Sequence, residues 1–170
     1  MNFLDILKQY TNPSAAPATD VENHFDQVAQ QAPPQALGRG IAAALRSDAT
    51  PPFGQAVGNL FGQSNPQQQA GLLNELIQSI GPGAISGVAG GVLGRFFGAS
   101  TGGGATPTVT SAQASQLSPS DVNAIAAHAE QRDPSVIDRV GTFYAEHPTL
   151  VKTLGAVALS AVMGHLSARR

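Results

Sequence analysis

Helix-starting proline motifs punctuate this chain at short intervals, and the segments between them carry apolar residues at the spacing of an α-helix. Pro33-Pro34, Asn65-Pro66 and Ser118-Pro119 each place a proline where a helix can begin. The ring fixes φ, and the N–H that it removes would have no partner in the first turn. No window alternates apolar and polar residues with period two. The sequence therefore predicts an all-α fold, in which short proline-capped helices form one or more small bundles.

Each predicted helix has one apolar face. In the first half of the chain these faces are Phe3, Leu4, Leu7 and Tyr10; Val21, Phe25 and Val28; Leu37, Ile41 and Leu45; Phe53, Val57, Leu60 and Phe61; and Leu73, Leu76, Ile77 and Ile80. In the second half they are Val122, Ile125, Ala126 and Ala129, followed by Val136, Ile137, Val140, Phe143 and Tyr144. Thr19 and Glu22 have the spacing of a capping box. The last helix is expected to begin at His147-Pro148 and to run to Leu166.

One segment separates two helical regions. Residues 99–118, ASTGGGATPTVTSAQASQLS, contain no charge and no helical stripe, a composition typical of a flexible linker. The predicted division is an N-terminal helical region at 1–98, the linker at 99–118 and a C-terminal three-helix unit at 119–170. The expected core of the C-terminal unit consists of Val136, Val140, Phe143, Leu150, Leu154 and Val162.

The segment GAISGVAGGVLGRFFG, at 83–98, combines helical periodicity with a glycine on almost every turn. At 100° per residue its large apolar side chains fall on one side and its glycines on the other. The glycine face consists of Gly83, Gly87, Gly90, Gly91, Gly94 and Gly98. Each glycine inside a helix costs about 1 kcal/mol relative to alanine, so a face of them is tolerable only if a neighbour packs closely against it. The sequence therefore predicts a glycine-faced central helix and makes these six residues a candidate packing interface.

Three partners for this glycine face stay open at this point. It can pack inside the bundle, against a second copy of the chain, or within a membrane. The membrane alternative is weakened by length, since sixteen helical residues span about 24 Å whereas the hydrocarbon core is about 30 Å thick. The segment VGNLFGQS at 57–64 resembles LGRFFGAS at 93–100. The resemblance indicates either an internal duplication or two helices that use a similar local sequence independently.

Composition and motifs exclude several classes of function. The net charge is −2, the basic residues form no run, and tryptophan is absent, so we expect no nucleic-acid partner. Cysteine is also absent, which removes disulfides and thiolate chemistry. The four histidines fit no HExxH pattern, and no phosphate-loop or nucleophile-elbow motif occurs. We therefore predict a protein that is not an enzyme and that has no cofactor and no metal site.

The low charge favours self-association. Charged residues make up 12% of the chain, about half the usual share. We predict a non-enzymatic structural or interaction protein, of bacterial type, that forms a homo-oligomer or binds another protein through close helix packing. Peripheral membrane contact or secretion is one alternative, and carriage of a small apolar ligand is another. The first residues lack a signal-peptide pattern, so a cytoplasmic location is expected.

The composition is similar to that of the secreted harpin proteins of plant-pathogenic bacteria. The likeness consists of the absence of cysteine and the content of Gly, Gln and Ala. The proline-capped helices of this chain are a difference from the harpins. The likeness concerns composition only, so it implies no role for any residue.

Overall fold

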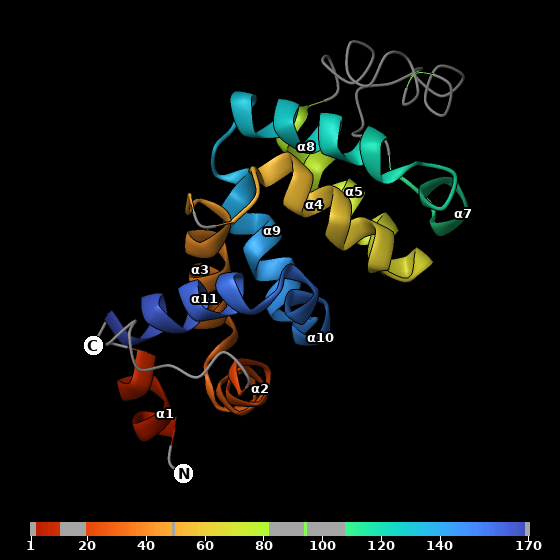
Figure 1. Cartoon of the computed structure of the whole chain (residues 1–170). Helices are drawn as coiled ribbons and strands as arrows, with labels where there is room; N and C mark the ends of the chain where they lie inside the picture. Colours follow the sequence, from red (N-terminus) through yellow and green to blue (C-terminus); the bar gives the residue numbers. More distant parts are fainter. Residues whose placement is uncertain (1–2, 11–19, 49, 82–93, 95–107, 169–170) are drawn as a thin grey trace. The chain divides into compact units, whose positions relative to one another are not determined.

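The computed structural model describes residues 3–10, 20–48, 50–81, 94 and 108–168 (Figure 1). Within these ranges the chain forms helices and turns and no strand, which confirms the all-α fold. In chain order the elements are α1 (Phe3–Tyr10), α2 (Val21–Gln31), α3 (Pro34–Leu45), α4 (Phe53–Gln63), α5 (Pro66–Ile80), α7 (Ser111–Ala114), α8 (Pro119–Arg132), α9 (Val136–Ala145), α10 (Pro148–Val151), the 3₁₀ helix η3 (Lys152–Leu154) and α11 (Ala156–Ala168).

Local side-chain hydrogen bonds fix the starts of α5 and α8. At α5 the Asn65 side chain accepts from the Gln68 amide at 2.9 Å, and the Asn65 amide donates back to the Gln68 side chain at 3.1 Å. Ser118 and Asp121 form the same reciprocal pair at the start of α8. Both helices have a proline in the first turn. These starts follow from neighbouring residues alone, because the bonds satisfy N–H groups that the helix leaves without a partner.

Two predicted helix boundaries need correction. The N-cap of α2 is Asp20, which makes no side-chain capping bond, while Thr19 lies outside the described residues. The last helix is not continuous from His147-Pro148 to Leu166. Gly155 has φ of 88°, a left-handed conformation that an α-helix cannot contain, and the segments Pro148–Leu154 and Ala156–Ala168 meet at 119°.

The described helices divide into two compact units. Unit 1 comprises residues 1–52 and 138–170. In it α11 packs on α3, α1 and α2, and α1 also packs on α2. The buried side chains of unit 1 include Val21, Phe25, Val28, Leu37, Ile41, Tyr144, Leu159, Val162 and Met163. Helix α11 needs partners on several sides because most of its residues are apolar, and three helices supply them.

Unit 2 comprises residues 53–137. Helix α4 lies against α8, and α5 packs on both α7 and α8. The buried side chains of this unit include Phe53, Val57, Leu60, Phe61, Leu73, Leu76, Ile77, Val122, Ile125 and Ala129. The predicted apolar faces of α4, α5 and α8 are therefore the faces that the structure buries.

These units differ from the predicted division of the chain. Helix α8 belongs to unit 2, whereas α10 and α11 belong to unit 1 with α1, α2 and α3. Residues 119–170 are thus not one three-helix unit, and the predicted common core is divided between the units, with Val136 in unit 2 and Val140 in unit 1. Phe143 and Leu154 are only half-buried. Helices far apart in the sequence pair here, and the burial of their apolar faces against each other stabilises that pairing.

The second half of the predicted linker is packed onto a helix. The Val109 amide donates to the Asn74 side chain of α5 at 2.7 Å, and the Asn74 side chain donates to the Val109 carbonyl at 3.3 Å. Val109 and Leu117 are 4% and 5% exposed, and α7 lies between them against α5. The linker prediction is therefore corrected for residues 108–118, and residues 99–107 lie outside the described part.

Candidate functional site: glycine contacts and a basic hollow

Glycine brings the backbones of α3 and α9 into contact within unit 1. A Cβ atom placed on Gly141 would lie 2.5 Å from the Gly38 carbonyl oxygen and 3.0 Å from both the Cβ and the amide nitrogen of Ala42. A Cβ on Gly38 would lie 3.0 Å from the Cα of Thr142. These separations are shorter than ordinary van der Waals contact, so only glycine fits at this crossing.

A second glycine contact joins α4 to α8 within unit 2. Gly54, Gly58 and Gly62 are spaced four residues apart and therefore share one side of α4. A Cβ on Gly54 would lie 2.7 Å from the Asn123 carbonyl oxygen, and one on Gly58 would lie 2.6 Å from the Pro119 carbonyl oxygen. This is the small-xxx-small spacing that allows two helices to approach closely.

The predicted glycine face falls almost wholly outside the described part of the chain. Gly83, Gly87, Gly90, Gly91 and Gly98 are not described. Gly94 is described and half-buried, and a Cβ on it would meet no atom of the described residues within 4 Å. The assignment of these six residues to a packing interface therefore stays a prediction.

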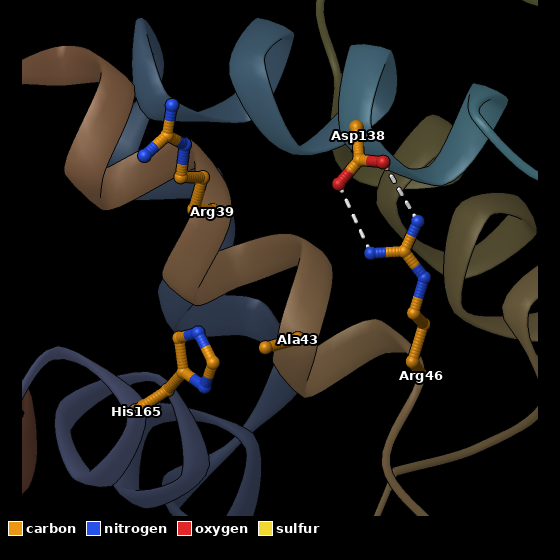
Figure 2. Close-up of a pocket in the computed structure, with 5 residues that line it drawn as sticks. All are labelled: Arg39, Ala43, Arg46, Asp138 and His165. Carbon is orange, nitrogen blue, oxygen red and sulfur yellow. Dashed lines mark hydrogen bonds and ion pairs between the residues drawn. The ribbon is translucent and has the colours of Figure 1, made fainter. Parts of the chain in front are cut away.

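A charged hollow of about 520 Å³ opens on unit 1 (Figure 2). Arg39 and Ala43 of α3, Arg46 at the end of α3, Asp138 of α9 and His165 of α11 line it. A neighbouring hollow of about 230 Å³ shares Arg39 and Asp138 and is completed by the neutral side chains of Gln35 and Thr142. Both hollows lie over the α3–α9 pair that the glycines hold together.

Arg46 and Asp138 form a two-pronged ion pair at the edge of the hollow. The Arg46 Nη1 and Nη2 atoms donate to the two Asp138 carboxylate oxygens at 3.0 and 2.8 Å (Figure 2). This bonding lowers the pKa of Asp138 below its ordinary value; burial opposes the shift, and the positive charges of Arg46 and Arg39 add to it. The side chains are 43% and 54% exposed, so the pair contributes at most about 1 kcal/mol to folding. Its main effect is to occupy both oxygens of Asp138, the one carboxylate among the described residues that line the hollow.

Arg39 and His165 supply the remaining charge and hydrogen-bonding capacity. Arg39 is exposed and makes no hydrogen bond or ion pair with the described part of the chain. His165 is half-buried and lies beside Ala43 (Figure 2). Among the described residues, two guanidinium groups, one imidazole and one carboxylate therefore line the hollow, which gives this lining a net positive charge.

Two further histidines, His24 and His147, have local partners. The His24 Nδ1 atom lies 3.0 Å from the Tyr10 hydroxyl oxygen. Burial and the charge of Asp20 raise the pKa of Tyr10. His147 makes no capping bond and stacks edge-on against Phe143. Within the described ranges, no group of three or more histidine or acidic side chains is arranged to hold a metal ion.

None of the described helices alone is long and apolar enough to span a membrane. The segment Pro148–Leu154 and helix α11 reach the length and hydropathy of a span only when taken together, and the two are sharply bent relative to each other. No protein-family model, no curated protein and no solved structure matches the chain.

Proposed function

We propose that this chain is a non-enzymatic interaction protein that self-associates through the glycine face at 83–98. The observation that carries the proposal is the use of glycine for close helix packing in the described part of the chain. A Cβ on any of six helical glycines would meet a neighbour within 3.3 Å; they are Gly38, Gly40, Gly54, Gly58, Gly62 and Gly141. The glycines at 83–98 repeat the four-residue spacing of Gly54, Gly58 and Gly62, which is suited to the same kind of close approach.

The internal sequence echo supports the same reading. In the resemblance between 57–64 and 93–100, Gly58 corresponds to Gly94 and Gly62 to Gly98. Gly58 lies against the start of α8, where the two backbones almost touch. A similar local sequence at 93–100 is suited to the same kind of contact, and a second copy of the chain provides a surface for it.

Two other functions receive less support. The apolar side chains of α11 that would enter a membrane surface, Leu159, Val162 and Met163, are buried in unit 1. The two hollows of unit 1 are lined mostly by charged and polar side chains, which do not suit a small apolar ligand. A cytoplasmic location is part of the proposal, and fractionation of cells that express the chain tests it.

Gly91→Leu is expected to dissociate the oligomer and leave the monomer helical. A leucine side chain on the glycine face holds the two helices apart, so close contacts along the interface are lost. Light scattering should show a fall in molar mass, and circular dichroism should show unchanged helix content. The matched variant Gly91→Ala adds one methyl group and improves helix propensity, so its effect on mass should be smaller.

Two results would contradict the proposal. If Gly91→Leu lowers the free energy of unfolding but not the mass, the glycine face is packed inside the chain. If it changes neither quantity, the face is open to solvent. Co-sedimentation of the wild-type chain with vesicles would favour the membrane-surface alternative instead.

A further inference from the structure

We infer that unit 2 is an insertion whose folding controls the stability of unit 1, because folded unit 2 keeps together the two separate stretches of chain that build unit 1. Unit 2 is one continuous stretch, residues 53–137, whereas unit 1 is assembled from residues 1–52 and 138–170. The inference rests on this chain topology and on the contacts that join the two stretches. It does not depend on self-association at 83–98.

The chain leaves unit 1 and re-enters it at neighbouring points. Before the insertion, the Thr50 hydroxyl oxygen lies 2.7 Å from the Ala44 carbonyl oxygen and 2.9 Å from the Ser47 carbonyl oxygen, so the chain is held at the end of α3. After the insertion, Asp138 is the first residue of unit 1, and its carboxylate accepts two hydrogen bonds from Arg46 (Figure 2). The two connections to unit 2 therefore start side by side on unit 1.

Much of the packing inside unit 1 joins its two stretches. Helix α11 of the second stretch packs on α1, α2 and α3 of the first. The part of α9 that belongs to unit 1 touches α3 where Gly141 meets Gly38. Unit 1 therefore forms only when the two stretches, which the whole of unit 2 separates in the sequence, come together.

The state of unit 2 determines how much conformational entropy this closure costs. An unfolded chain at 53–137 is a long flexible loop, and the cost of joining its ends rises with the logarithm of its length. Folded unit 2 has already lost that freedom, because its two ends are held at a fixed separation. The folding equilibrium constant of unit 1 should therefore fall at least about tenfold when unit 2 unfolds. By linkage, a partner that binds only folded unit 2 also stabilises unit 1.

Denaturant unfolding of the full chain with two optical probes tests this inference. The only two tyrosines of the sequence, Tyr10 and Tyr144, are buried and belong to unit 1, so the tyrosine signal in near-ultraviolet circular dichroism follows unit 1 alone. Far-ultraviolet circular dichroism follows the helices of both units. Gly58→Leu, which places a side chain against the backbone of α8 inside unit 2, should lower the midpoints of both signals. Gly62→Ala, on the same helix, is the matched control and should leave both midpoints nearly unchanged. The inference is overturned if Gly58→Leu lowers the helix midpoint while the tyrosine midpoint stays at its wild-type value.

An engineered disulfide tests whether loop closure is the cause of the coupling. The chain has no cysteine of its own, and a Cβ on Gly40 of α3 would lie 3.2 Å from the Leu166 Cγ of α11, a separation compatible with a disulfide. When oxidised, the pair Gly40→Cys and Leu166→Cys joins the two stretches of unit 1 covalently. Gly58→Leu should then shift the tyrosine midpoint much less than it does in the reduced form of the same protein. An equal shift in the oxidised and reduced forms would overturn the inference, because a covalent link between the stretches removes most of the closure cost.

Discussion

Gly141→Leu should unfold unit 1 or destabilise it by about 3 kcal/mol or more, at the upper end of the cost of overpacking. The position has no space for any side chain, because the first carbon would lie 2.5 Å from the Gly38 carbonyl oxygen and 3.0 Å from the Ala42 amide nitrogen. Both neighbours are backbone atoms of α3, so they move only if the whole helix moves. Since α3 also packs on α11, its displacement disturbs the core of the unit. Denaturant unfolding of the variant measures the loss.

Two glycine-to-alanine substitutions distinguish the cost of a steric clash from the gain in helix propensity. Alanine is preferred to glycine in a helix by about 1 kcal/mol, so Gly→Ala stabilises wherever the methyl group fits. At Gly164 of α11 the nearest atom of the described residues to an added Cβ is the Tyr10 carbonyl oxygen at 3.9 Å, and Gly164→Ala should be neutral or stabilising. Gly141→Ala should instead lower the free energy of unfolding. Effects of the same sign at both positions would contradict the close contact between α3 and α9.

Gly58→Leu should have a comparable effect on unit 2. Its Cβ would lie 2.6 Å from the Pro119 carbonyl oxygen and 3.3 Å from the Asn123 Cβ, at the first turn of α8. Helix α8 would have to shift along α4, which would pull Val122 and Ile125 out of positions where both are fully buried. We expect a loss of about 3 kcal/mol, measured as a lowered thermal midpoint of the full chain.

Gly62→Ala is the control for the α4–α8 contact. Gly62 is exposed, and among the described residues a Cβ there would meet only the Pro119 ring, at 3.3 Å. The gain in helix propensity should largely offset that single contact, so the midpoint should change little. A large loss at Gly62 together with a small loss at Gly58 would mean that α4 presents a different side to α8.

Elements specified by adjacent residues could be predicted from the sequence. The starts of α5 and α8 follow from Asn65-Pro66 and Ser118-Pro119, because the cap bonds join residues three apart. The apolar stripes correctly identified the buried side chains of α2, α3, α4, α5 and α8, since helical periodicity places them on one face. The break at Gly155 has a local signal as well, namely a glycine in an otherwise apolar run, but glycine alone does not distinguish a left-handed turn from a packed helix position.

Arrangements between distant segments could not be predicted in this way. The residues that line the hollow come from distant parts of the sequence. Arg46 and Asp138 are 92 residues apart, and His165 lies on a third helix. Arginines that form no run in the sequence are thus brought together only by the fold. The close contact of α4 with α8 had a sequence signal in the spacing of Gly54, Gly58 and Gly62, but that spacing does not say which helix approaches. The pairing of chain ends in unit 1 depends on the total apolar surface buried, which no single segment reveals.

The molar mass of the wild-type chain in solution, measured by light scattering over a series of concentrations, tests self-association most directly. The chain has a mass of 17.3 kDa. We predict a mass of at least twice that value at the highest concentrations, falling toward the monomer on dilution as mass action requires. A constant mass of one chain, from micromolar to near-millimolar concentration, would contradict the proposal that the glycine face joins two copies.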